Sequence, residues 1–222
     1  MLRVQEVRGR VEEACRAAGR PPDAVRIVAV GKLQPVEAVA EAVAAGLVDV
    51  GESRVQEART KMAAVDGARW HMIGRLQGNK AAVVGRVFDW LHSLDRGELV
   101  PLLARGASGR KAPLQVLIQV NLAGEPQKGG CEPDAAAGLI AACRDHPGLA
   151  VRGLMTVPPA GGDPRPQFRR LRSLLEELRE EFPALDLREL SMGMSGDFEA
   201  AIAEGATMVR IGTAIFGPRQ GG

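Results

Sequence analysis

The 222-residue sequence contains no tyrosine, and aromatic residues make up only 3% of it. Nucleic-acid-binding proteins commonly stack bases on aromatic side chains and carry a basic surface, whereas here basic and acidic residues are interspersed and the net charge is +2. We therefore expect no nucleic-acid partner. The sequence also lacks an apolar stretch long enough to cross a bilayer and a signal-peptide core near its N-terminus. We expect a cytoplasmic protein with no membrane partner.

Cysteine and histidine are also scarce, with three residues of each. Cys15, Cys131 and Cys143 are widely separated and have no CxxC spacing, and the histidines do not cluster. This pattern argues against disulfides and against a metal site, and it predicts reduced, mostly buried thiols. The sequence has no linker, repeat or low-complexity segment, so we expect one domain over residues 1–222.

What the sequence does contain is a regular alternation of short β-branched runs and amphipathic helical stripes. The first run is RIVAVGK (26–32), and it precedes a helical segment that Pro35 can open and Gly46 can end. The alternation continues to residue 217 and predicts eight strands and seven crossover helices, with no helix after strand eight. Near-continuous apolar strands between helices are typical of a parallel sheet that helices cover.

Eight such units close into a (β/α)8 TIM barrel, which we predict as the α/β fold of this chain. The outer ring would then lack one helix. The N-terminal helix, which carries Val4, Val7, Val11 and Cys15 on one stripe, would complete that ring. A doubly wound open sheet is the competing arrangement. In a barrel, the functional site lies at the C-terminal ends of the strands.

Small residues gather after strands seven and eight, in SMGMSGD (191–197) and RIGTAIFG (210–217). Loops at these two positions of a barrel frequently form a phosphate site, and the first loop leads into a helix whose opening N–H groups can bind an anion. Ordinary turn chemistry is the alternative interpretation. Because two adjacent strands share the pattern, we predict a phosphate site that includes Gly212 and Thr213.

Lys32 follows the first strand, which neighbours strand eight in a closed barrel. Side chains alternate along a strand, so Val28, Val30 and Lys32 are predicted to share the inner face. Burial and the nearby cation Arg210 would lower the pKa of Lys32, and a neutral amine attacks an aldehyde to form an imine. A lysine that merely extends into solvent is the alternative. Its position at the barrel mouth favours imine chemistry.

An aldehyde that carries a phosphate is either a sugar phosphate, as in Schiff-base aldolases, or pyridoxal 5'-phosphate (PLP). The lysine and the phosphate site alone do not distinguish these two. Arg210 favours PLP, because a guanidinium group that faces the pyridine nitrogen is a recognised way to hold that ring.

Eight segments of the chain resemble one known family. They are VAVGKLQP, DVGESRVQEA, WHMIGRLQGNK, FDWLHSLD, VLIQVN, RGLMTVPP, FRRLR and LSMGMSGDFEAAIAEGATMVRIGTAIFG. These segments extend over nearly the whole chain and resemble the YggS/PROSC family of pyridoxal phosphate homeostasis proteins, whose fold is related to the barrel domain of alanine racemase. The resemblance implies PLP as the cofactor.

The resemblance also implies a cofactor site around Lys32, which would hold PLP as an internal aldimine. Ser191, Met194, Ser195, Gly212 and Thr213 would surround the phosphate and the ring, Arg210 would lie near the ring or the phosphate, and Met155 along one face, while Ser53 would approach the ring oxygen. It stays open whether Ser191 or Arg210 faces the pyridine nitrogen.

Three departures from the family pattern lie near the expected imine. Ser53 replaces the usual asparagine, which puts the contact to the ring oxygen in doubt. Gly31 replaces a serine, and Leu33 and Gln34 replace a Thr-Lys pair, so a second nearby amine is missing. The anchoring lysine is not affected by any of them.

The GRLQGNK segment and the histidine that precedes it have less specific signals. Gln77, Asn79 and Lys80 would form either a wall of the site or a helix cap with a solvated surface. We predict that His71 is a structural, hydrogen-bonded histidine.

The absence of tyrosine bears on catalysis. In the related alanine racemases, the cofactor lysine works with a tyrosine base from a second domain, and this sequence offers neither the tyrosine nor, by our reading, the domain. The resemblance therefore implies a non-enzymatic protein that buffers PLP or delivers it to apo PLP-dependent enzymes, and we expect a monomer. A slow single-base PLP-dependent amino-acid racemase is the alternative, and a Schiff-base aldolase is a third.

Overall fold

The computed structural model describes residues 3–125 and 129–217. Within these residues, eight parallel strands form a closed barrel in sequential order, as predicted. The strands are β1 (Arg26–Val30), β2 (Asp49–Glu52), β3 (Arg69–Met72), β4 (Trp90–Leu94), β5 (Leu114–Gln119), β6 (Leu149–Met155), β7 (Glu189–Met194) and β8 (Met208–Ile211). The ring closes between β1 and β8, where Val28 pairs with Arg210. The open doubly wound sheet is thereby excluded.

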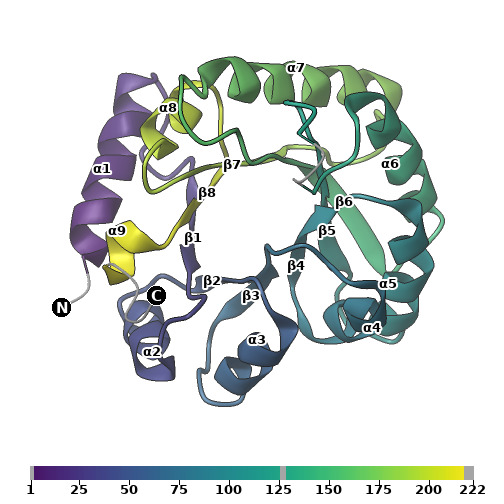
Figure 1. Cartoon of the computed structure of the whole chain (residues 1–222), viewed down its shortest axis with the longest axis horizontal. Coiled ribbons are helices and arrows are strands. Elements are labelled where there is room, and N and C mark those ends of the chain that lie inside the picture. The colour runs from purple at the N-terminus through teal and green to yellow at the C-terminus, as the bar shows by residue number, and fades with distance from the viewer. Residues whose placement is uncertain (1–2, 126–128, 218–222) are drawn as a thin grey trace.

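Helices surround the strands as an outer ring (Figure 1). In the described part of the chain, seven α-helices link consecutive strands, as the periodicity predicted. They are α2 (Val36–Ala44), α3 (Val55–Met62), α4 (Gly78–Val87), α5 (Val100–Ala107), α6 (Ala136–Arg144), α7 (Arg165–Glu181) and α8 (Phe198–Ala203), with short 3-10 helices at Gly97–Leu99 and Pro133–Ala135. Pro35 caps α2 with an extended ψ of 156°, so the helix begins one residue later than predicted.

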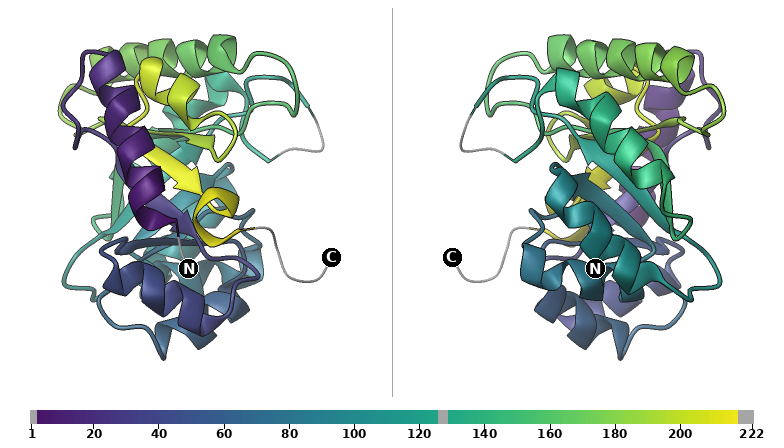
Figure 2. Two further views of the ribbon diagram at one scale, coloured as in Figure 1. Left: turned by 90° about the vertical axis from the view of Figure 1, so that its left-hand side faces the viewer. Right: turned by 90° about the vertical axis from the view of Figure 1, so that its right-hand side faces the viewer.

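The N-terminal helix α1 (Val4–Ala17) fills the gap in the outer ring beside α8, as predicted (Figures 1 and 2). Its buried residues Val4, Val7, Val11 and Cys15 form the predicted stripe. An ion pair between Arg10 and Glu199 also joins α1 to α8.

The prediction that no helix follows strand eight was wrong. Strand β8 stops at Ile211, and a four-residue helix, α9 (Thr213–Phe216), follows it. The backbone turns because Ile215 and Phe216 pack into the core between the barrel and α1, and the carbonyl of Ile215 accepts a hydrogen bond from the Arg3 N–H. Two consecutive apolar residues fit a helical turn as well as a strand, so the sequence pattern did not distinguish the two.

Apolar side chains form two separate layers. A large core lies between the strands and the helices, and a small cluster of Val28, Trp90, Leu117, Met155 and Met208 fills the barrel interior. The three cysteines are free and buried, as predicted, and burial raises the pKa of Cys143 to about 12. Among the described residues, none of the helices combines the length and the apolar character that a membrane span requires.

Candidate functional site

Lys32 lies in the turn that follows β1, at the C-terminal end of the barrel. It is half-buried, and the register Val30↔Gly51 places this turn beside Ser53, which follows the neighbouring strand β2. Leu33, the next residue, has a φ of 60°, a left-handed conformation that is unusual for a branched side chain. Such backbone strain persists only where surrounding contacts hold it.

Four hydrogen bonds hold the turn that carries Lys32. The Gly31 N–H donates to the Gly51 carbonyl and the Gln34 N–H donates to the Gly31 carbonyl, both at 3.0 Å. From α3, the carboxylate of Glu57 accepts the Leu33 N–H, and the ammonium of Lys61 donates to the Gly31 carbonyl at 2.7 Å. The turn is therefore fixed from both sides.

Lys61 belongs to a buried charge cluster with Glu52 and Glu57. Its ammonium lies 2.7 Å from a carboxylate oxygen of each, and Lys61 and Glu52 are almost fully buried. The second oxygen of Glu52, Oε2, has no hydrogen-bond partner among the described residues. Burial outweighs the attraction of the ammonium and raises the pKa of Glu52 to about 7.

The raised pKa of Glu52 predicts a pH-dependent contribution to stability. Between the ordinary value of 4.5 and about 7, the folded state holds a proton that the unfolded state has released, so stability falls as pH rises. Glu52→Gln removes this dependence. From pH 5 to pH 8 we expect the free energy of unfolding of the variant to rise by about 2–3 kcal/mol relative to that of the unaltered protein. Urea unfolding at the two pH values measures this difference. The exposed substitution Glu13→Gln is the control, and equal slopes in both proteins would refute the assignment.

The sequence departure at Gly31 has a physical reason in this cluster. A Cβ added at Gly31 would lie 3.0 Å from Oε1 of Glu52 and 3.0 Å from a methyl group of Val39. Both distances are tighter than ordinary van der Waals contact. A side chain at this position would therefore require Glu52 and Val39 to shift by a few tenths of an ångström.

Beside the turn that carries Lys32, the ends of β7 and β8 bring the predicted phosphate residues together. Met194 ends β7 and Ser195 follows it. The hydroxyl oxygen of Ser195 accepts the Ala214 N–H at 3.3 Å, which links the loop after β7 to α9. Gly212 approaches the end of β1, where an added Cβ would lie 3.4 Å from Val30. Met194 and Thr213 are exposed, and Ser195 and Gly212 are half-buried.

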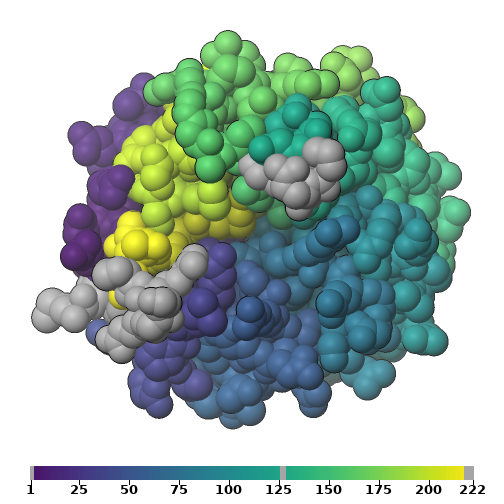
Figure 3. Space-filling view, viewed as in Figure 1, coloured from purple at the N-terminus to yellow at the C-terminus, as the bar shows by residue number. Residues whose placement is uncertain are grey.

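The same arrangement is visible on the surface. In Figure 3 the yellow segment around α9 borders the purple-blue segment that follows β1. The lysine-bearing turn and the small-residue loops therefore meet at one face of the barrel.

Below this mouth lie Ser191 and Arg210, both buried. One guanidinium nitrogen of Arg210, Nη1, donates to the carbonyl and to the hydroxyl of Ser191 at 2.8 and 2.7 Å, and Nη2 donates to the Thr156 carbonyl at 2.8 Å. Burial lowers the pKa of Arg210 to about 10, which still leaves the group charged. Met155 lies nearby in the interior cluster, since it pairs with Ser191 across β6 and β7.

The hydroxyl of Ser191 continues into a row of buried histidines. His92 Nδ1 lies 2.9 Å from Ser191 Oγ, His92 Nε2 lies 2.9 Å from His71 Nδ1, and His71 Nε2 lies 2.8 Å from a carboxylate oxygen of Asp49. As predicted, His71 is a buried, hydrogen-bonded histidine. The ring of His71 also stacks on Trp90, with centroids 5.6 Å apart.

Sequence reasoning missed Asp49, His92, Glu57 and Lys61. Asp49 and His92 lie on predicted strands, and alternation along each strand would have indicated which face each presents, but not that both contact His71. Lys61 lies on α3 in a charged segment that reads as solvated surface. The signal for its burial was weak, because Glu57 at i−4 is equally typical of an exposed pair.

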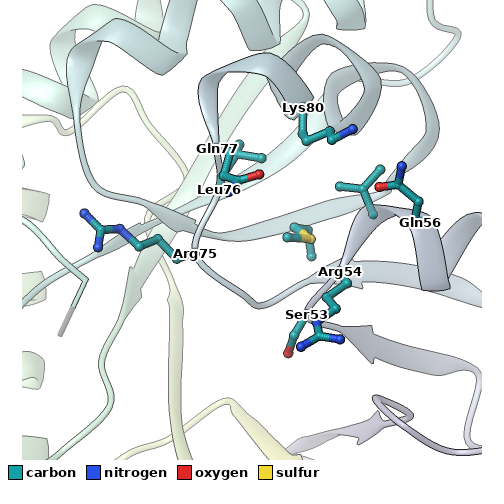
Figure 4. Close-up of a pocket in the computed structure, with 9 residues that line it drawn as sticks. Ser53, Arg54, Gln56, Arg75, Leu76, Gln77 and Lys80 are labelled. Carbon is teal, nitrogen blue, oxygen red and sulfur yellow. The ribbon is translucent and has the colours of Figure 1, made fainter. Parts of the chain in front are cut away.

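A pocket opens beside Ser53 and has a volume of about 420 Å³ (Figure 4). It is lined by Ser53, Arg54, Val55, Gln56, Met72, Arg75, Leu76, Gln77 and Lys80. Figure 4 shows Lys80 of α4 and Gln56 of α3 on facing sides of the space, whereas Arg75 points away from both. Gln77 and Lys80 thus line this pocket, and Gln77 makes no side-chain cap on α4. Asn79 is exposed.

Comparisons with known proteins place this geometry in context. Residues 3–220 match the alanine racemase N-terminal domain family. A pyridoxal phosphate homeostasis protein from Pseudomonas aeruginosa is 45% identical over 99% of this chain and 95% of its own length. The structure of PipY from Synechococcus elongatus, with PLP bound, is 36% identical, with a TM-score of 0.82 over 93% of this chain and 100% of PipY. Alanine racemase from Bacillus anthracis, at 21% identity and a TM-score of 0.67, shares the fold over 98% of this chain and 57% of its own.

Proposed function

Because this chain belongs to the family of pyridoxal phosphate homeostasis proteins, whose barrel is the alanine racemase N-terminal domain, we propose that it binds PLP covalently through Lys32 and takes part in PLP homeostasis. The observation that carries the proposal is the meeting, at one barrel mouth, of the fixed Lys32 turn with the small-residue loops after β7 and β8. The cofactor-binding residues that we propose are Lys32, Ser53, Met155, Ser191, Met194, Ser195, Arg210, Gly212 and Thr213.

The residues at the mouth fit a phosphate. Ser195 and Thr213 supply hydroxyl groups, and a Cβ added at Gly196 would meet no atom within 4 Å, so the loop after β7 is open. The carboxylate of Asp197 accepts the Met194 N–H, which engages this acid with its own loop. Hydroxyl and backbone donors on small residues are the usual ligands of phosphate groups in barrels.

When bound, PLP would supply an aldehyde with which the amine of Lys32 could condense, with release of water. The chain itself would position the two groups. The Gly31 and Leu33 contacts fix the turn that carries Lys32, and the β7 and β8 ends would hold the phosphate beside it. Ser53 on the neighbouring strand end would contact the ring oxygen through a single hydroxyl.

We propose a carrier rather than an enzyme. The chain contains no tyrosine, so it lacks the side chain that serves as the second base in the related racemases, and the positive charge of Arg210 beside the ring disfavours a protonated pyridine, which is the stronger electron sink. Recipients would be apo PLP-dependent enzymes. We further propose that the chain acts as one domain, as a monomer and in the cytoplasm.

The experiment that tests the proposal compares the purified protein with Lys32→Ala. We expect an absorbance band at about 420 nm after PLP is added, a borohydride-stable adduct that peptide mapping assigns to Lys32, and the loss of both in the variant. Lys111→Ala, on an exposed loop, is the control and should retain both. A band of equal strength in Lys32→Ala would disprove Lys32 as the anchor.

The racemase alternative has a separate readout. PLP-loaded protein incubated with L- or D-alanine in deuterated water should show no α-proton exchange above that of free PLP. Exchange that exceeds this background and disappears in Lys32→Ala would replace the carrier by a single-base racemase.

A further inference from the structure

A continuous row of buried hydrogen bonds crosses the barrel interior from β2 to β8. It begins at Asp49, the first residue of β2, passes through His71 and His92, and reaches Ser191 and Arg210 below the mouth. Each consecutive pair is separated by 2.7–2.9 Å, and the two histidines and Ser191 are fully buried. Hydrogen positions in such a row are not independent, because each neutral imidazole has one donor and one acceptor nitrogen.

The direction of the row is set at Asp49. One oxygen of its carboxylate accepts a hydrogen bond from Arg69 at 2.8 Å, and Arg26 lies at 4.0 Å. Burial acts to raise the pKa of Asp49, but these cations together with His71 outweigh it and lower the pKa, so the group is ionised and can only accept. The nitrogen of His71 that faces it, Nε2, must therefore carry a hydrogen.

The remaining hydrogens follow from this one. Burial lowers the pKa of His71 and of His92, so both rings are neutral and Nδ1 of His71 is an acceptor. His92 must then donate to it from Nε2, which leaves Nδ1 of His92 as an acceptor for the Ser191 hydroxyl. Arg210 also donates to the oxygen of Ser191, and this agrees with a hydroxyl whose hydrogen points to His92.

We infer that Asp49, His71 and His92 are positioning residues that turn the hydrogen of Ser191 away from the barrel mouth. Ser191 then presents only lone pairs to a bound ligand. The consequence for the cofactor rests on the proposed function. A pyridine nitrogen without a proton is itself a hydrogen-bond acceptor, so Ser191, whose hydrogen points to His92, cannot form a hydrogen bond with it. Arg210, which has five N–H groups, is the donor that can. The structure also assigns to Ser191 the role of holding Arg210 in place, because its carbonyl and hydroxyl oxygens both accept hydrogen bonds from Nη1.

The arrangement also explains how a carboxylate on β2 acts on a hydroxyl on β7. Solvent cannot exchange hydrogen-bond partners between them, since His71, His92 and Ser191 have no exposed surface. If residue 49 donated a hydrogen bond to His71 instead of accepting one, donor and acceptor would be exchanged in every hydrogen bond up to Ser191. The Ser191 hydroxyl would then be able to donate toward the mouth. The substitution Asp49→Asn supplies this reversal, because an amide can donate to Nε2 of His71.

Nitrogen-15 NMR of the histidine rings in the protein without PLP tests the inference. At pH 7 we expect His71 and His92 both to be neutral with the hydrogen on Nε2, whereas in Asp49→Asn the two nitrogens of each ring should exchange their chemical shifts. The half-buried His146 is assigned by its loss in His146→Gln, and the exposed substitution Asp66→Asn is the control. A hydrogen on Nδ1 of either ring in the unaltered protein, or unchanged rings in a folded Asp49→Asn, would overturn the inference.

A second variant keeps the test decisive if Asp49→Asn does not fold. Ser191→Ala removes the far end of the row but leaves Asp49, so both rings should keep the hydrogen on Nε2, and a switch to Nδ1 would show that Ser191 rather than Asp49 sets the direction. In PLP-loaded protein, Asp49→Asn should shift the visible absorbance maximum while the amount of borohydride-stable adduct on Lys32 stays the same. Because the NMR readout needs no cofactor, a failure of the hydrogen assignment is distinguishable from a failure to bind PLP.

Discussion

Lys61→Met is expected to lower the free energy of unfolding by about 3–5 kcal/mol at pH 8, the usual cost of removing one partner of a buried ion pair. The ammonium of Lys61 lies between the carboxylates of Glu52 and Glu57 and also donates to the Gly31 carbonyl. Methionine has a similar length but no charge, so Glu52 would be left buried without its cation. The loss should be smaller at pH 5, where Glu52 is protonated in the folded state.

Urea unfolding at the two pH values measures this effect, and the double variant Lys61→Met with Glu52→Gln separates charge from packing. If the unpaired carboxylate is the cause, the double variant should recover most of the loss at pH 8. Lys111→Met, on an exposed loop, should change stability by less than about 0.5 kcal/mol. Equal stability of Lys61→Met and the unaltered protein at pH 8 would contradict the buried charge cluster.

Gly193→Ala is expected to destabilise the protein by about 2–4 kcal/mol, from backbone strain and overpacking together. Gly193 has a φ of +92°, and an added Cβ would lie 2.6 Å from the Cβ of Ala201 and 3.0 Å from the Cα of Phe198. The end of β7 must therefore move away from α8. Because Met194 and Ser195 move with it, we also expect weaker PLP binding, measured as the PLP concentration at half-maximal absorbance at about 420 nm.

Gly196, in the loop that follows β7, provides the matched control. A Cβ at this position would meet no atom within 4 Å, and its φ is not in the left-handed region. Gly196→Ala should therefore unfold at the same urea concentration as the unaltered protein. If Gly193→Ala behaved in the same way, the close packing of β7 on α8 would be refuted.

Much of the fold was predictable because local patterns determine it. The alternation of apolar runs and helical stripes, each with a fixed period, indicated eight strands and the helices between them. The stripe of α1 indicated its place in the outer ring. The short helix α9 was not predictable in this way, because its two apolar residues suit a strand as well as a single helical turn, and only the contact with α1 selects the turn.

The candidate site was likewise predictable only in part. The sequence by itself determined that Lys32 lies just after the first strand and that small residues follow the last two strands, since strand order brings these ends together in any closed barrel. Only the tertiary structure decided which charges are buried and which hydrogen bonds connect them. Lys61 turns inward because two carboxylates from different elements meet it, and Asp49, His71 and Ser191 form one row because their separate strands lie at a matching height. Periodicity reports the face that a residue occupies, whereas the partners on that face are set by strand register and barrel closure.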